Sequence, residues 1–184
     1  RMVEDQENVF YYLTIMNENY AHPGLKEGEE EGSLRGMYKL QEGGKHALRV
    51  QLMGSGTILH ESIKAAALLE ADWGISADVW SVTSFTELRR DGLDANRENL
   101  LNPEAKNPRV PYFTQQISTT EGPVITSTDY VKLFGDQVRE FIPEGRTYRV
   151  LGTDGYGRSD FRFKLREHFE VDRHFIVASA LKAL

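Results

Sequence analysis

The chain has 184 residues, with 22 Lys and Arg, 28 Asp and Glu, no Cys and a net charge of −6. The lack of Cys excludes a disulfide scaffold, a thiolate zinc site and a cysteine nucleophile, and the acidic balance argues against a nucleic-acid-binding protein, which normally carries a basic face. No apolar run approaches the roughly 20 residues that cross a bilayer, so we expect no membrane partner. The first residues do not resemble a signal peptide. Because the sequence stops at Leu184 inside an apolar helical pattern, we expect it to be a piece of a longer protein.

The amino-terminal part of the chain differs from the rest. Residues 8–16 are β-branched and aromatic and nearly continuous, which predicts a strand buried on both faces. Turn-forming residues follow at 17–24. The acidic, glycine-broken stretch 26–32 predicts a solvated connector, with an acidic docking patch as the alternative. A short edge strand is predicted at 36–40, and we place a domain boundary within 22–36.

From residue 47 onward strands and helices alternate. The predicted strands cover 47–53, 78–84, 122–127 and 148–151. The predicted helices run from Leu59 to a glycine cap at Gly74, from 86 to 101, from a cap at Thr128 to Ile142, from Ser159 or Asp160 to Phe169, and from Asp172 onward. Prolines at 103, 108 and 111 are expected to break regular structure. This alternation predicts an α/β layer sandwich with a mainly parallel sheet.

Polar residues follow each of these strands at its carboxyl end, where ligands collect in open α/β sheets. Hydroxyl groups and free backbone amides near helix starts favour anions. They make a candidate site for a small anion or regulatory ligand from Ser55, Gly56, Ser84, Ser127, Thr128 and Asp154. Ordinary strand-to-helix turns are the alternative interpretation.

Known catalytic motifs are incomplete in this sequence. Gly54–Leu59 resembles the start of a dinucleotide fingerprint, but Leu59 stands where the third glycine belongs. The five His residues show no metal-binding spacing, and no serine lies in a nucleophile elbow. We therefore assign no catalytic, cofactor-binding or metal-binding residue to this chain.

Several segments, in order along the chain, resemble one family. Residues 152–160 and 165–172 resemble the closing segment of a transketolase-type carboxyl-terminal domain. The other matching segments resemble the homodimeric, thiamine-diphosphate-dependent decarboxylating component of bacterial pyruvate dehydrogenase complexes; they are 8–14, 17–20, 51–56, 79–88, 90–92, 108–112 and 127–130.

The resemblance implies a three-layer α/β sandwich with a mixed, mainly parallel sheet over residues 31–184. It also implies that residues 1–30 are an arm holding the last strand of a preceding pyrimidine-binding domain and a linker. The family's enzyme decarboxylates pyruvate and reductively acetylates the lipoyl group of dihydrolipoyl acetyltransferase. It uses thiamine diphosphate and Mg²⁺, works as a homodimer and is cytoplasmic in bacteria.

The cofactor ligands of that family lie in domains before this one, so this chain is expected to be inactive alone, to bind no cofactor and to stabilise the dimer. The last strand of the pyrimidine-binding domain ends near the cofactor cleft in that family, and the turn after the first predicted strand follows it. Asn17, Asn19, Tyr20 and His22 are therefore candidates for the active-site entrance, with hinge and turn roles as the alternative. A binding module at the strand ends remains the competing hypothesis.

Overall fold

The computed structural model describes residues 1–11 and 19–184. Most of the strand predicted at 8–16 lies outside the described residues, and its described part, 8–11, has no regular secondary structure.

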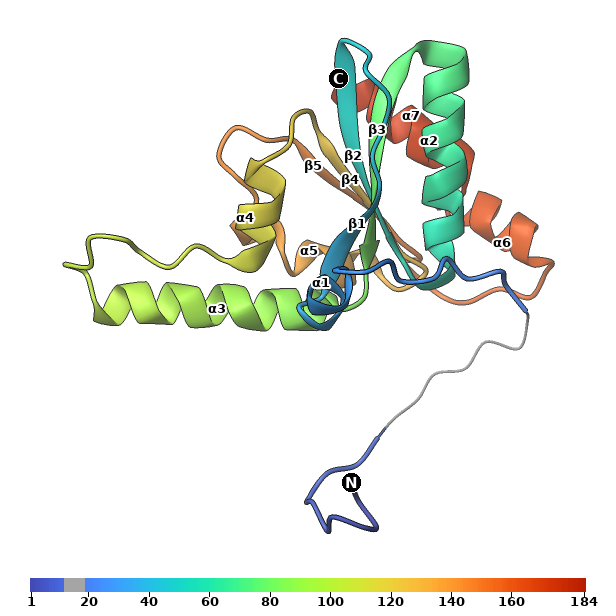
Figure 1. Ribbon diagram of the computed structural model, residues 1–184. Coiled ribbons are helices and arrows are strands. Elements are labelled where there is room, and N and C mark those ends of the chain that lie inside the picture. Colours follow the sequence, from blue (N-terminus) through green and yellow to red (C-terminus); the bar gives the residue numbers. More distant parts are fainter. Residues whose placement is uncertain (12–18) are drawn as a thin grey trace.

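Five strands form one sheet in the order β1-β3-β2-β4-β5 (Figure 1). Strand β1 runs antiparallel to β3, and all other neighbouring strands are parallel. The fold class predicted from the alternating pattern is therefore confirmed. The strands are β1 (Met37–Gln41), β2 (Leu48–Ser55), β3 (Ile75–Val82), β4 (Val124–Ser127) and β5 (Tyr148–Leu151).

Helices cover both faces of the sheet, which gives three layers (Figure 1). Helices α2 and α7 pack on one face, and α3 and α4 pack on the other. The helices are α1 (Glu30–Leu34), α2 (Leu59–Trp73), α3 (Phe85–Leu101), α4 (Tyr112–Ser118), α5 (Lys132–Asp136), α6 (Arg162–His168) and α7 (Arg173–Ala183). Two 3₁₀ turns, η1 (Gly56–Ile58) and η2 (Arg139–Phe141), complete the elements.

Caps explain where the longer helices begin and end. Gly74 ends α2 in the left-handed conformation, with φ of 60°. The Ser84 side chain accepts a hydrogen bond from the Glu87 amide at the start of α3. The Asp172 carboxylate accepts hydrogen bonds from two amides at the start of α7. The predicted caps at Gly74 and Asp172 are thus confirmed.

The single helix predicted from Thr128 to Ile142 is wrong. The chain instead forms the short helix α5 and the turn η2. The Thr128 hydroxyl accepts from the Tyr130 amide in a local turn, and α5 starts only after Val131. Gly135 explains part of the break, because a Cβ there would lie 2.7 Å from Val150 Cγ1 of β5. The segment packs too close to the sheet for a continuous amphipathic helix.

Other elements also differ from prediction; strand β3, for example, covers Ile75–Val82 and not 78–84. The acidic stretch expected to be a connector contains helix α1. Helix α4 was not predicted, because Pro111 was read as a breaker although it stands at the N-cap, where a proline fits. Helix α6 begins after Phe161, and the Asp160 carboxylate accepts from the Phe161 amide next to it instead of capping the helix.

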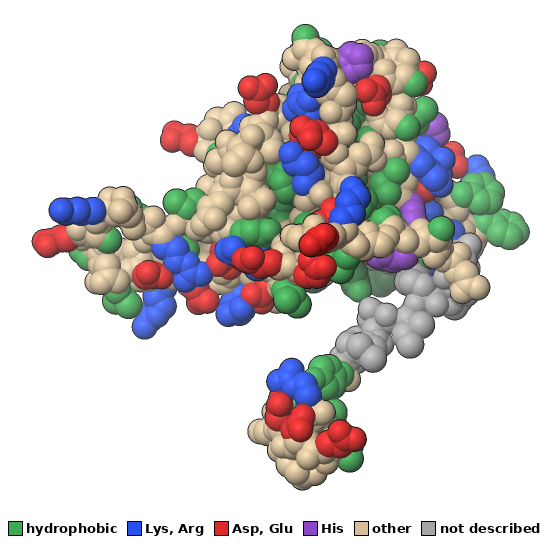
Figure 2. All heavy atoms as spheres, in the orientation of Figure 1, with side chains coloured by type: hydrophobic (Ala, Val, Ile, Leu, Met, Phe, Trp, Pro, Cys, Tyr) green, Lys and Arg blue, Asp and Glu red, His purple; other side chains and the backbone are tan. Residues whose placement is uncertain are grey.

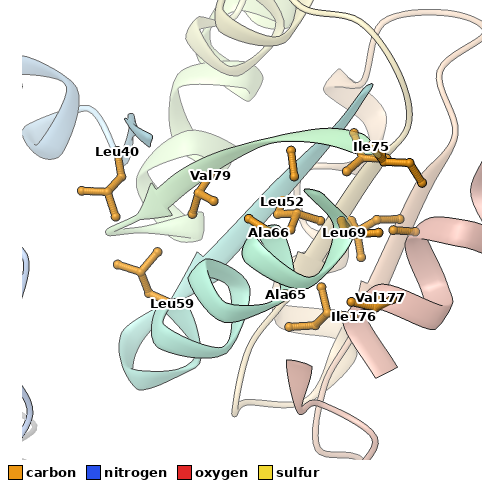
Figure 3. Close-up of a cluster of buried hydrophobic side chains, with 14 of the residues drawn as sticks. Leu40, Leu52, Leu59, Ala65, Ala66, Leu69, Ile75, Val79, Ile176 and Val177 are labelled. Carbon is orange, nitrogen blue, oxygen red and sulfur yellow. The ribbon is translucent and has the colours of Figure 1, made fainter. Parts of the chain in front are cut away.

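Alternating residues of each strand face opposite layers, so the core has two parts. Between the sheet and helices α2 and α7, Leu52, Leu69 and Ile176 are fully buried (Figure 3). On the other face Trp80 and Phe113 are buried with residues of α3 and α4. The side-chain period of two in a strand accounts for this division.

A buried carboxylate joins the three strands at one edge of the sheet. Asp78 in β3 is 2% exposed. It accepts hydrogen bonds from the Arg49 guanidinium, from Gln51 Nε2 at 2.9 Å and from the Gly43 amide at 2.8 Å. Gln51 in turn accepts from Trp80 Nε1 at 2.8 Å. The network satisfies the buried charge and fixes how β2 lies against β3.

Replacing this carboxylate should weaken the fold. We expect Asp78→Ala to lower the free energy of unfolding by about 2 kcal/mol, because the half-buried Arg49 would lose its carboxylate partner and the buried Gln51 would lose one of its two acceptors. Urea unfolding of the chain measures the change. Asp94→Ala is the matched control, since Asp94 is 52% exposed and pairs only across a surface turn of α3; it should change the value by less than about 0.5 kcal/mol. Equal effects of the two substitutions would contradict this role of Asp78.

Candidate functional site

A second buried carboxylate, Glu61 in the first turn of α2, holds the last two helices. Glu61 is 2% exposed. Its Oε2 accepts from Arg173 Nε at 2.9 Å and from the Arg173 amide at 3.1 Å. Its Oε1 accepts from Arg173 Nη2 at 3.1 Å and from Arg166 Nη1 at 3.3 Å. We call these three residues the Glu61 cluster; it joins α2 to α6 and to the start of α7.

The charges of the cluster keep Glu61 ionised. Burial alone would raise the pKa of the Glu61 carboxyl. The hydrogen bonds from the side chain and amide of Arg173 and the charges of Arg173 and Arg166 together outweigh this effect, so the pKa of Glu61 is lowered overall. A carboxylate paired in this way contributes to stability whenever it is charged.

Arg166 also connects the core to the amino-terminal segment. Its Nη2 donates to the Tyr20 hydroxyl at 3.2 Å and lies 3.5 Å from Thr57 Oγ1. The Tyr20 ring stacks on His60, with centroids 5.5 Å apart and planes at 20°. Burial lowers the pKa of His60, with further lowering by the charges of Lys64, His22 and Arg166. A neutral imidazole therefore faces the tyrosine at neutral pH.

Beside this cluster, a crevice of about 320 Å³ opens at the carboxyl ends of β2, β4 and β5. The chain leaves β2 toward α2 on one face and leaves β4 toward α5 on the other, so this is the point where the strand order reverses. The Thr57 hydroxyl donates to Asp129 Oδ2 at 3.3 Å across it. We call it the switch-point crevice; its polar lining is Thr57, Asp129, Thr153, Arg158, Arg162 and Arg166, and its apolar wall is Leu165, Phe169 and Val171.

A separate, wider crevice of about 690 Å³ lies at the carboxyl ends of β2 and β3. The segment 22–25 lines one side of it, and Tyr130 and Phe134 line another. Ser55, Gly56 and Ser84 also line it. The close approach of the chain there requires Gly54, because a Cβ would lie 2.5 Å from the Leu59 Cα.

The structure separates the six residues predicted to form one anion site. Ser55, Gly56 and Ser84 line the wider crevice. Ser127 and Thr128 are fully buried, and the Ser127 hydroxyl has no hydrogen-bond partner. Asp154 lies elsewhere, where it accepts from the Lys132 amide at 2.9 Å and pairs with the Lys132 ammonium at 3.7 Å. An anion site built from all six residues is not assembled, and ligand binding by any of them stays a prediction.

The candidates for an active-site entrance also lie apart. Asn17 is outside the described residues, and Asn19 is exposed. Tyr20 lies against His60 and Arg166, as described above. His22 Nδ1 lies 2.9 Å from the Pro23 carbonyl oxygen, and His22 lines the wider crevice.

The sequence did not predict the Glu61 cluster, because Arg166 and Arg173 lie 105 and 112 residues from Glu61 along the chain.

The described residues contain no group of three or more His, Asp or Glu side chains that could hold a metal ion. None of the helices in the described ranges is long and apolar enough to cross a membrane.

On the face shown in Figure 2, acidic and basic side chains are mixed along α3, and some form ion pairs, such as those of Arg109 with Asp91 and Glu98. This mixed surface agrees with the acidic composition.

Comparison with known families and proteins gives two consecutive matches. The model of the transketolase-like TK C-terminal domain matches residues 36–172, and that of the pyruvate dehydrogenase E1 component middle domain matches residues 1–23. The pyruvate dehydrogenase E1 component of Pseudomonas aeruginosa is 55% identical over the whole chain, which covers 21% of that protein. The E1 component of Escherichia coli K12 is 54% identical over 98% of the chain and 20% of that protein. The chain spans about a fifth of the length of these curated relatives.

Solved structures share the fold at much lower identity. A split-gene transketolase, described as an inactive beta4 tetramer, is similar with a TM-score of 0.55 and 19% identity, over 82% of this chain and 42% of that one. Transketolase from Leishmania mexicana is similar with a TM-score of 0.53 and 16% identity, over 83% of this chain and 18% of that one. These likenesses show the fold alone.

The Glu61 cluster makes the free energy of unfolding depend on pH in the acidic range. Because the pKa of Glu61 is lowered in the folded chain, its contribution is present above the unfolded pKa of about 4.3 and is lost as the pH falls through the folded value. We expect Glu61→Gln to lower the unfolding free energy by about 3 kcal/mol at pH 7. The difference from wild type should shrink as the pH falls below about 4. Urea unfolding at a series of pH values measures both.

Glu70→Gln on the same helix is the matched control. Glu70 is 47% exposed and lies 3.6 Å from His46 at the surface, so its loss should change stability little. A gap between wild type and Glu61→Gln that stayed constant down to pH 3 would show that the cluster does not act through ionised Glu61.

Proposed function

This chain belongs to the family of transketolase-like carboxyl-terminal domains, and from that premise we propose that it is the carboxyl-terminal domain of a pyruvate dehydrogenase E1 component. The parent protein would decarboxylate pyruvate on thiamine diphosphate. It would then reductively acetylate the lipoyl group of dihydrolipoyl acetyltransferase. The observation that carries the proposal is the identity of about half the residues to E1 components along the whole chain.

The domain division follows the same proposal. We assign residues 1–30 to an arm that holds the last strand of a pyrimidine-binding domain and a linker, and residues 31–184 to the carboxyl-terminal domain. The match of residues 1–23 to the E1 middle domain and of 36–172 to the carboxyl-terminal domain supports a boundary between them. The sheet and its covering helices all lie after residue 29.

The described residues of this chain do not fit the cofactor. In the described ranges no three carboxylate or imidazole groups gather as Mg²⁺ ligands would. Gly54 and Gly56 follow the fingerprint only in part, and a Cβ at position 54 would meet the Leu59 backbone, so Gly54 is explained by close packing. We therefore place the ligands of thiamine diphosphate and Mg²⁺ in other domains of the parent protein and route no chemical step through this chain.

We propose that this domain helps to fix the position of the preceding domain of the parent protein. Arg166 is held by Glu61 and donates to Tyr20, and Tyr20 stacks on His60, so the arm is attached to the folded domain just after the proposed pyrimidine-binding strand. A fixed attachment orients one domain relative to the next. The proposed parent protein is a cytoplasmic bacterial homodimer, and its partners are a second copy and the acetyltransferase with its lipoyl domain.

The activity of the parent protein tests the proposal. We expect the full-length protein, supplied with thiamine diphosphate and Mg²⁺, to release CO₂ from pyruvate and to acetylate an isolated lipoyl domain. The 184-residue chain should show no saturable binding of cofactor and Mg²⁺ by isothermal titration calorimetry. 2-Oxoglutarate is the control substrate and should be decarboxylated far more slowly. A parent protein that leaves pyruvate untouched, or a chain that binds cofactor near micromolar strength, would contradict the proposal.

The arm residues give a narrower test. If they line the active-site entrance, Asn19→Ala and His22→Ala in the full-length protein should each raise the KM for pyruvate at least about threefold, because a polar contact to substrate or entrance is lost. Thr119→Ala is the control, since Thr119 is exposed at the end of α4 and its hydroxyl bonds only to a carbonyl of the same helix. Unchanged steady-state constants for both arm variants would leave these residues with turn roles only.

A further inference from the structure

The proposed function assigns no role to the switch-point crevice. It lies where the strand order reverses, at the carboxyl ends of β2 and β4, and its volume of about 320 Å³ falls within the range of small-molecule pockets. Its lining combines two chemistries: three guanidinium groups and two hydroxyls, and the apolar side chains of Leu165, Phe169 and Val171.

The guanidinium groups at the crevice differ in whether an acidic side chain pairs with them. Arg166 pairs with the buried carboxylate of Glu61, which it shares with Arg173, and this pairing holds it at the crevice. Arg158 is exposed and makes no hydrogen bond or ion pair with any residue in the described part of the chain. An arginine that faces a crevice without an acidic partner offers its full set of donors to a ligand.

The other polar groups extend this donor set. The hydroxyls of Thr57 and Thr153 line the same crevice. Asp129 is the acidic residue among the lining groups, and the Thr57 hydroxyl donates to it. Two residues before Asp129, at the end of β4, the buried Ser127 hydroxyl has no hydrogen-bond partner. Buried polar groups without a partner are uncommon in folded proteins.

We propose that the switch-point crevice binds a small organic oxyanion, with a phosphate or carboxylate head held by Arg158 and a short apolar body against Leu165 and Phe169. Planar guanidinium forks match both heads, and the hydroxyls of Thr57 and Thr153 add neutral donors. The Asp129 carboxylate lines the same crevice and repels the head, which favours a position beside the arginine. Binding at this crevice can be measured without enzymatic activity.

The test is a titration of the 184-residue chain followed by backbone amide NMR. Inorganic phosphate and acetate are the probes, each added at constant ionic strength maintained with NaCl. We expect saturable shifts of the Thr57, Thr153 and Gly155 amides, with a dissociation constant on the order of 1 mM for at least one probe. Saturation by phosphate alone assigns a phosphate head, and saturation by acetate alone assigns a carboxylate head. Non-saturable shifts with both probes would overturn the proposal.

Three substitutions locate the binding. Arg158→Ala should weaken it at least about tenfold, the loss expected for one charge-assisted hydrogen bond, and should leave the fold intact because Arg158 is exposed and unpaired among the described residues. Asp129→Asn should tighten it severalfold by removing a like charge. Arg97→Ala is the control, since Arg97 is exposed on α3. Equal affinities of Arg158→Ala and Arg97→Ala would overturn the assignment.

Discussion

The carboxylate of Glu61 is the constraint on which the carboxyl-terminal third of the structure depends. Helix α6 has no fully buried residue, and its apolar contacts are limited to partly buried side chains such as Leu165. Its position follows from the ion pair of Arg166 with Glu61, and the start of α7 follows from the three hydrogen bonds of Arg173 to the same group. A buried charge is costly unless its partners surround it, so each of these contacts is required once Glu61 is buried. The switch-point crevice and the attachment of Tyr20 both follow from this one group.

The sequence predicted the sheet and the longer helices because local signals and burial agree there. Apolar runs lie in strands that are covered on both faces. Gly74 and Asp172 act as caps for local reasons, the left-handed conformation of Gly74 and the hydrogen bonds that the Asp172 carboxylate accepts from nearby amides. The prediction failed between β4 and β5, where Gly135 must lie close to Val150. That contact joins two segments through the fold, and no pattern within 128–142 reports it. Helix α4 was missed for a related reason, since its residues bury against α3 and the sheet.

The candidate site was predictable only in its location. The rule that ligands collect at the carboxyl ends of parallel strands drew attention to one edge of the sheet, where the two crevices lie. It could not say which side chains share a crevice, because neighbouring strand residues point to opposite faces. Ser55 and Ser84 therefore line one crevice, whereas Ser127 is enclosed and Asp154 pairs with Lys132. The arginines of the other crevice come from a loop and a helix far along the chain, and nothing local marks them.

The two buried carboxylates show how the two ends of the sheet differ. Asp78 lies toward the amino ends of β2 and β3, and its donors come from the strands and the turn beside them, so it serves the sheet alone. Glu61 lies beyond the carboxyl end of β2, and its donors come from helices that follow the last strand. Because Arg166 satisfies Glu61 and still reaches Thr57 and Tyr20, the same interaction that stabilises the domain also reaches the crevice and the arm. A change that disturbs Glu61 should therefore alter both, whereas a change at Asp78 should alter stability alone.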